Sequence, residues 1–137
     1  MIFADSSFWV ALYNRGDDEH LRALSLARDR SSTLFVTTNH VRGETWTFLA
    51  RRAGHRAAVR FLDGLERSPR VRTLFVSEDM EGDAVRWLRR HDEREYSFVD
   101  ATSFVAMRAM RLSEALTFDA DFAAAGFRSL PAAGKKT

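Results

Sequence analysis

Residues 115–122 read ALTFDADF, a short apolar run that ends in an acid. The same order occurs near the start of the chain, where residues 2–7 read IFADSS. A short apolar run predicts a strand, and an acid directly after the run lies at the carboxyl end of that strand. Because parallel strands joined by right-handed crossovers end at one edge of the sheet, we expect Asp5 and Asp119 to lie close together.

Strand-like and helix-like segments alternate along the rest of the chain. We predict strands at residues 2–4, 34–37, 71–76 and 115–118, with a weaker fifth at 127–130. The runs at 34–36 and 74–76 are apolar throughout, which predicts strands covered on both faces. Helical periodicity fills the intervals, with two consecutive helices between the second and third strands that turn at Gly54. This alternation predicts an α/β fold with a mainly parallel sheet of four to five strands.

The bulk composition fits one globular domain. The 137 residues are 45% hydrophobic and 29% charged, and they include no cysteine, which excludes disulfides and thiolate metal sites. No apolar run is long enough for a membrane span or a signal peptide, so a soluble cytoplasmic protein is expected. We predict a single domain over residues 1–130 and a flexible tail over residues 131–137, which read PAAGKKT.

The basic residues are almost all arginines, since Lys135 and Lys136 are the only lysines. Guanidinium groups bind phosphate in a bidentate manner and stack on bases, which suits a nucleic-acid partner. A preference for arginine codons would give the same composition. Five arginines on expected helices are candidate RNA contacts or simply solvated helix faces: Arg52, Arg56, Arg60, Arg86 and Arg90.

Glu44 occupies an unusual place on the helix that follows Asn39. It lies three residues after Val41 and four before Phe48, on the stripe that also holds Thr45 and faces the sheet edge. A glutamate in such a position needs a partner. A salt bridge with His40, one turn earlier, is the structural alternative to a functional role.

Each remaining acid also has an ordinary explanation. Asp5 would cap a helix over residues 8–14, and Asp100 would cap a helix over residues 101–110. Asp119 and Asp121 would form a solvated turn. Taken together these explanations weaken, because two carboxylates about 4 Å apart repel by roughly 4 kcal/mol at an effective dielectric near 20. Several acids gathered at one edge need protons or a cation, and Mg²⁺ or Mn²⁺ suits all-oxygen ligands.

Four motifs of the sequence resemble those of the PIN domain family, and more narrowly those of the VapC-type toxins of bacterial toxin–antitoxin pairs. They are IFADSS, VRGETW, FVDATSF and ALTFDADFAAAGF, in the family's order and spacing. The resemblance implies a three-layer α/β/α fold in which Asp5, Glu44, Asp100 and Asp119 form a catalytic quartet that binds Mg²⁺ or Mn²⁺. It also matches Ser6 to a supporting hydroxyl residue and Asp121 to an acid found in only some members, and Thr102 is a further candidate supporting residue.

The implied function is a metal-dependent endoribonuclease toxin that hydrolyses RNA through an activated water. Its implied partners are RNA, a cognate antitoxin and a second copy of the chain. The alternative is a non-enzymatic interaction module whose acids serve as caps and ion pairs. A phosphotransfer receiver domain would need a lysine after a late strand, and a HAD-type phosphatase would need Asp-x-Asp after the first strand; both are absent.

The helix that carries Glu44 has a second apolar stripe, formed by Trp46, Leu49, Ala50 and Ala53. A helix packed on one sheet needs only one apolar face, so this stripe is expected to be covered by something else. The next helix of the hairpin would cover it, and so would an antitoxin segment or a second copy of the chain. Of these, an antitoxin contact is the prediction.

Overall fold

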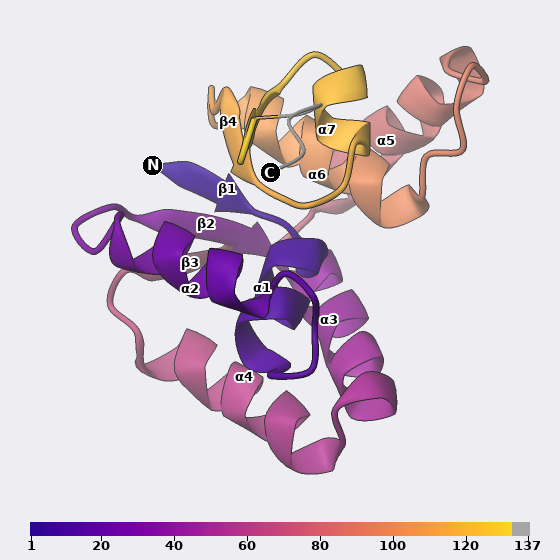
Figure 1. The fold of residues 1–137 in the computed structure, drawn as a ribbon. Coiled ribbons are helices and arrows are strands. Elements are labelled where there is room, and N and C mark those ends of the chain that lie inside the picture. The colour runs from indigo at the N-terminus through magenta and orange to yellow at the C-terminus, as the bar shows by residue number, and fades with distance from the viewer. Residues whose placement is uncertain (133–137) are drawn as a thin grey trace.

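The computed structural model describes residues 1–132, which form a five-stranded sheet with helices on both faces (Figure 1). The elements in chain order are β1 (Ile2–Ala4), α1 (Ser6–Tyr13), α2 (His20–Arg28), β2 (Phe35–Thr38), α3 (Asn39–Arg52), α4 (His55–Arg67), β3 (Val71–Leu74), α5 (Glu78–Arg90), α6 (Phe98–Ala109), β4 (Glu114–Leu116), α7 (Asp121–Ala124) and β5 (Arg128–Leu130). The predicted tail lies outside the described residues from position 133 onward.

The sheet is parallel throughout, in the order β3-β2-β1-β4-β5. The first two crossovers move from β1 to β2 and then to β3. The third crossover returns past β1 to β4, so the direction of winding reverses between these two strands. In open α/β sheets the crevice outside the carboxyl ends at such a reversal is the usual place for a ligand.

The reversal of winding also determines on which side of the sheet each helix lies. Helices α1 to α4 lie together on one side of the sheet, and α5 to α7 lie on the other (Figure 1). This is the arrangement that right-handed crossovers require when the winding direction changes once. The three-layer α/β/α architecture predicted from the sequence is therefore confirmed.

The core is rich in phenylalanine. The ring centroid of Phe104 lies 5.0 Å from that of Phe122 and 5.1 Å from that of Trp87. The central strand contributes Phe3, which is fully buried. Burying a side chain of this size stabilises the fold by about 1.5–3 kcal/mol, and these rings hold α5, α6 and α7 against the sheet.

The prediction that the third strand is covered on both faces is wrong. The strand ends at Leu74 rather than at residue 76, and its residues are at best half-buried. Phe75 directly after it is 61% exposed. The physical reason is its position, because β3 forms one edge of the sheet and the apolar run extends beyond the paired residues.

The fourth strand is also shorter than predicted. It ends at Leu116, and the chain then curves across the carboxyl edge of β1. Within that curve the Phe118 amide donates a hydrogen bond of 2.9 Å to Ser7 Oγ. The short helix α7 follows, so the alternative of a simple solvated turn at Asp119 and Asp121 is wrong.

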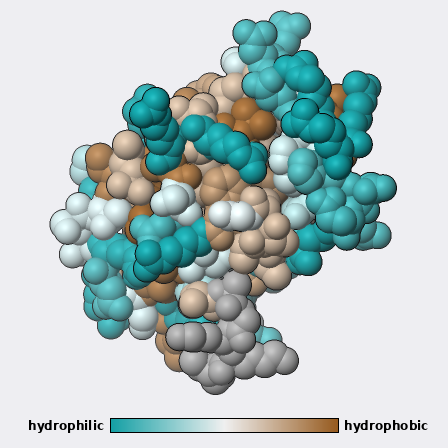
Figure 2. Space-filling model, turned by 90° about the horizontal axis from the view of Figure 1, so that it is seen from above, coloured by the Kyte–Doolittle hydropathy of each residue, from teal (hydrophilic) through white to brown (hydrophobic). Residues whose placement is uncertain are grey.

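No helix within residues 1–132 is both long and apolar enough to cross a bilayer. Figure 2 shows apolar side chains across the middle of the face seen from above, with hydrophilic side chains around much of its edge.

Candidate active site

Asp5 is held at the carboxyl end of β1, and its side chain is only 3% exposed in the fold. Its Oδ2 accepts hydrogen bonds of 3.0 Å from both Ser7 Oγ and Thr117 Oγ1. Asp5 occupies the N-cap position of α1, as the capping explanation predicted, but its carboxylate makes no capping hydrogen bond to the helix. Burial raises the pKa of Asp5 to about 6, and the charge of Glu44 adds to the increase.

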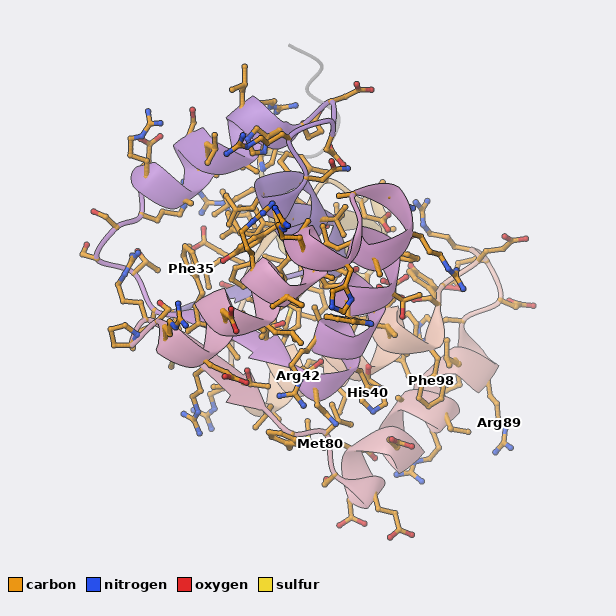
Figure 3. All side chains as sticks on the ribbon, turned by 90° about the horizontal axis from the view of Figure 1, so that it is seen from below. Phe35, His40, Arg42, Met80, Arg89 and Phe98 are labelled. Carbon is orange, nitrogen blue, oxygen red and sulfur yellow. The ribbon has the colours of Figure 1, made fainter. Side chains whose placement is uncertain are left out.

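Glu44 faces the same edge from α3. Ser6 Oγ donates a hydrogen bond of 2.5 Å to Glu44 Oε1. The alternative pairing with His40 is wrong, because His40 Nε2 lies 3.1 Å from Glu81 Oε2 instead. The His40 ring stacks beside Phe98 at the start of α6 (Figure 3). His40 is therefore paired with α5, and Glu44 faces the site without it.

Asp100 lies in the first turn of α6 but is not its N-cap. The helix begins at Phe98, and Ser97 caps it by accepting a hydrogen bond of 2.9 Å from the Asp100 amide. In return Asp100 Oδ2 accepts one of 3.1 Å from the Ser97 amide. Burial raises the pKa of Asp100 to about 7, with further increases from the charges of Asp5, Asp121 and Asp119.

Asp119 and Asp121 follow β4 in a tight turn. The Asp121 amide donates a hydrogen bond of 3.1 Å to Asp119 Oδ1. Burial and the neighbouring Asp121 raise the pKa of Asp119. Burial acts to raise the pKa of Asp121 too, but hydrogen bonds from Arg94, Asp119 and Asp100 outweigh it and leave that pKa below its usual value. The bond from Arg94 Nε bridges the α5–α6 loop to α7.

Three acids converge, and two of them, Asp100 and Asp119, belong to the predicted quartet. Carboxylate oxygens of Asp100, Asp119 and Asp121 all lie within 4.8 Å of one another. Ser6, Glu44 and these three acids line one pocket of about 380 Å³. Asp5 is not among the lining residues, but it accepts a hydrogen bond from Ser7, which is. Because oxygen ligands lie about 2.0–2.6 Å from Mg²⁺ or Ca²⁺, oxygens at such separations fit around one divalent ion.

Two supporting residues escaped the sequence analysis, and one candidate was wrong. Ser7 and Thr117 position Asp5, and each stands within two residues of an acid in the motifs IFADSS and ALTFDADF. Thr102 is fully buried, and its hydroxyl bonds at 2.8 Å to Val99 O of the same helix. Thr102 therefore bonds within α6 and is not among the residues that line the pocket.

The candidate RNA-binding arginines occupy several different places. Arg52 lines the acidic pocket, whereas Arg56 and Arg60 lie on α4 beyond the turn at Gly54, which has a φ of 97°. Their regular spacing therefore does not form one helix face. Two more, Arg86 and Arg90, line a separate groove of about 480 Å³ between α5 and α6.

The second apolar stripe of α3 is covered in part by α4. Leu49 is fully buried within the chain, so its predicted contact with an antitoxin or second copy is wrong. Trp46 lies edge-on to His55 of α4 at 5.6 Å between ring centroids and is half-buried, as is Ala50. Ala53 is exposed at the end of the helix. Packing of α4 against α3 in the hairpin therefore accounts for most of this apolar stripe.

A family model and two curated relatives match most of the chain. A family model described as the PIN domain matches residues 2–128. The 23S rRNA-specific endonuclease VapC20, from two strains of Mycobacterium tuberculosis, is 54% identical over 127 residues, which cover 93% of this chain and 95% of the relative.

Two solved structures also resemble this chain. The crystal structure of Mycobacterium tuberculosis VapC20, a sarcin-ricin loop cleaving toxin, superposes with a TM-score of 0.88 at 52% identity. It covers 93% of this chain and 96% of that one. VapBC2 from Rickettsia felis, bound to a promoter DNA fragment, has a TM-score of 0.62 at 15% identity over 90% of this chain and 92% of its own, which shows a shared fold alone. The matches agree with the family expected from the four motifs.

Proposed function

Because the chain belongs to the PIN domain family, we propose that it is a metal-dependent endoribonuclease and the toxin of a toxin–antitoxin pair. The observation that carries this proposal is the convergence of Asp100, Asp119 and Asp121 in the pocket that Glu44 also lines. The endonuclease relative, at 54% identity, supports the reaction class.

We assign Asp5, Glu44, Asp100 and Asp119 to the binding of Mg²⁺ or Mn²⁺, with Asp121 as an additional acid of the cluster. The donor set is entirely oxygen, as these hard cations prefer. When bound, such an ion lowers the pKa of a water molecule and offsets negative charge on the phosphate under attack.

The neighbouring residues orient the acids. Ser6 fixes one oxygen of Glu44, and Ser7 and Thr117 together fix Oδ2 of Asp5. Ser97 holds Oδ2 of Asp100 through its backbone amide. Outer groups of this kind commonly determine ligand orientation and affinity for the ion.

Electrostatics favour a cation in the pocket. The raised pKa values of Asp5 and Asp100, about 6 and about 7, mean that their ionised forms are disfavoured by burial and by neighbouring negative charge. The repulsion between the ionised carboxylates is relieved either by protonation or by a bound divalent ion. Near neutral pH a divalent ion offsets more negative charge than one bound proton does, because it carries two positive charges.

The proposed substrate is RNA, and the relative's target makes 23S rRNA the first to test. The proposed partners are a cognate antitoxin and a second copy of the chain, in the cytoplasm. Candidate RNA contacts are the exposed arginines, of which Arg52 lies at the pocket itself.

A cleavage assay tests the proposal. The purified protein is incubated with a sarcin-ricin-loop RNA hairpin while Mg²⁺ or Mn²⁺ is titrated, and EDTA serves as the blank. We expect metal-dependent cleavage that Asp100→Asn abolishes and that Asp79→Asn, at an exposed position of α5, leaves intact. Absence of both cleavage and a Mn²⁺-dependent thermal shift would favour the non-enzymatic interaction module.

A further inference from the structure

Two half-buried aromatic rings line the acidic pocket, and each contacts an arginine. The Arg52 guanidinium lies 4.7 Å from the ring centroid of Phe48, and that of Arg22 lies 5.8 Å from the centroid of Phe118. Both phenylalanines are among the lining residues. They differ from core rings such as Phe122, which is fully buried, because they keep surface that faces the pocket.

Helix geometry places the ring of Phe48 close to Glu44 of the acidic pocket. Glu44, Phe48 and Arg52 are four residues apart on α3, and all three line the pocket. Each step of four residues advances about 6 Å along a helix. An acid, an aromatic face and a cation therefore succeed one another along the wall that leads away from the acid cluster.

The ring of Phe118 lies close to the acids because Phe118 is adjacent to Asp119 in the sequence. Phe118 directly precedes Asp119, and its amide is held by Ser7 Oγ at 2.9 Å. Val10 of α1, which is 2% exposed, adds an apolar surface to the same pocket. The pocket thus has an acidic part and an apolar part side by side.

The charge of the lining restricts what the apolar part accepts. The lining includes one arginine, Arg52, and seven carboxylates: Asp17, Glu19, Glu44, Glu95, Asp100, Asp119 and Asp121. A phosphate is repelled by such a wall except where a divalent ion or the arginine balances it. An uncharged flat ring is accepted, because aromatic and guanidinium groups both stack on nucleobases.

We propose that Phe48 and Phe118 form a stacking site for one unpaired nucleobase of the RNA, next to the phosphate held at the acid cluster. This inference rests on the nuclease function proposed above. The Arg52 and Arg22 guanidinium groups lie over these two rings and form part of the stacking surface. A base inside a duplex cannot enter such a site, which is consistent with the loop target printed for the relative.

Conservative substitutions test the stacking role without emptying the pocket. Phe48→Leu and Phe118→Leu keep apolar volume but remove the aromatic face, whereas Phe48→Tyr and Phe118→Tyr keep it. We expect each leucine variant to raise KM for a loop RNA about tenfold with little change in kcat, and the tyrosine variants to restore it. The control is Phe75→Leu, at an exposed ring outside the pocket; thermal unfolding confirms that each variant folds.

A binding measurement separates this inference from the nuclease function. Fluorescence anisotropy with the Asp119→Asn variant compares intact RNA with RNA that lacks one base beside the cleavage position. We expect the abasic RNA to bind about tenfold more weakly, and the added Phe48→Leu change to remove that difference. Equal binding of both RNAs overturns the stacking site whatever the activity. Absence of cleavage by the wild-type protein, with the base effect retained in Asp119→Asn, overturns only the nuclease function.

A protein occupant gives a different result. If the apolar part of the pocket served only an antitoxin side chain, the leucine variants would bind the antitoxin more weakly and keep the KM of the wild type. That outcome also overturns the stacking site.

Discussion

Ser6 Oγ donates a hydrogen bond of 2.5 Å to Glu44 Oε1, although the two residues are 38 positions apart in the chain. The bond joins the first turn of α1 to the middle of α3. It fixes one oxygen of the glutamate at the pocket wall, so the orientation of that acid depends on a residue that follows Asp5 directly.

Removal of this bond is expected to weaken metal binding. Ser6→Ala leaves Glu44 Oε1 without its donor, and loss of such an outer contact typically costs about 10- to 100-fold in metal affinity. Calorimetric titration with Mn²⁺ measures the change. Ser25→Ala, at an exposed position of α2, is the matched control. An unchanged affinity in Ser6→Ala would show that the serine does not position Glu44.

Replacement of the buried acid is expected to stabilise the metal-free protein. The pKa of Asp5 is about 6 in the fold against 3.8 ordinarily, which corresponds to about 3 kcal/mol of unfavourable charge burial at neutral pH. Asp5→Asn removes the charge but weakens the bonds from Ser7 and Thr117, so we expect the free energy of unfolding to rise by roughly 1–3 kcal/mol. Urea unfolding in EDTA at pH 8 measures the change, and RNA cleavage should be lost. A less stable variant contradicts the prediction.

The stability of the metal-free protein is expected to fall as pH rises from about 4 to 7. The raised pKa values of Asp5 and Asp100, about 6 and about 7, mean that the folded state holds more protons than the unfolded state in this range. Their contribution is fully present below about pH 4 and is lost as pH rises through 6 to 7. Thermal unfolding in EDTA measures the slope. The double variant Asp5→Asn, Asp100→Asn should reduce it, and saturating Mg²⁺ should offset it; an equal slope in the double variant would contradict the assignment.

Arg94 is expected to oppose metal binding. Its Nε donates to Asp121, which places a positive charge beside the acid cluster. Arg94→Gln removes that charge, so we expect Mn²⁺ to bind roughly three- to tenfold more tightly at low salt, with a smaller gain at high salt. The charge-matched control is Arg89→Gln on α5, whose side chain points away from the molecule (Figure 3). Weaker binding in Arg94→Gln would instead indicate that Arg94 holds Asp121 in a position the ion requires.

A tight contact between α1 and α4 predicts an effect on the fold alone. A Cβ atom at Gly64 would lie 2.1 Å from the Tyr13 hydroxyl oxygen, and the Tyr13 ring packs edge-on against Phe61 at 5.6 Å. We expect Gly64→Ala to lower the free energy of unfolding by roughly 1–3 kcal/mol, although alanine favours a helix by about 1 kcal/mol.

Chemical denaturation of three variants tests that prediction. Tyr13→Phe added to Gly64→Ala should recover part of the loss, because the hydroxyl is the closest atom. Gly43→Ala, where a Cβ meets nothing within 4 Å, should be neutral or stabilising. Equal stability of Gly64→Ala and Gly43→Ala would mean that the tyrosine moves aside without cost.

The sequence predicted the architecture because each crossover leaves a local signal. Apolar runs and acids after them located all five strands, and Gly54 marked the hairpin between α3 and α4. The exposure of β3 was not predictable, since an apolar run does not reveal whether its strand lies at the centre or at an edge. The start of α6 was also misplaced, because Ser97 and Asp100 are both acceptable caps and only their reciprocal bonds distinguish them.

The sequence indicates where the acids lie more readily than which residues they bond to. Asp5, Asp119 and Glu44 stood out because an acid at a strand end or on an inward stripe conflicts with burial. The bond from Arg94 to Asp121 spans 27 positions and depends on the path of a loop, so no periodicity signals it. The same holds for Ser6 and Glu44, which come together only when α1 and α3 pack.

The place of β1 in the middle of the sheet has a consequence for biosynthesis. Thr117 bonds to Asp5 across 112 positions, and β1 lacks its β4 neighbour until that late segment has been made. A growing polypeptide still attached to the ribosome therefore carries Asp5 from the outset but cannot complete the cavity. Translation itself delays the assembly of the acidic cavity until β4 and the residues up to Asp121 have emerged.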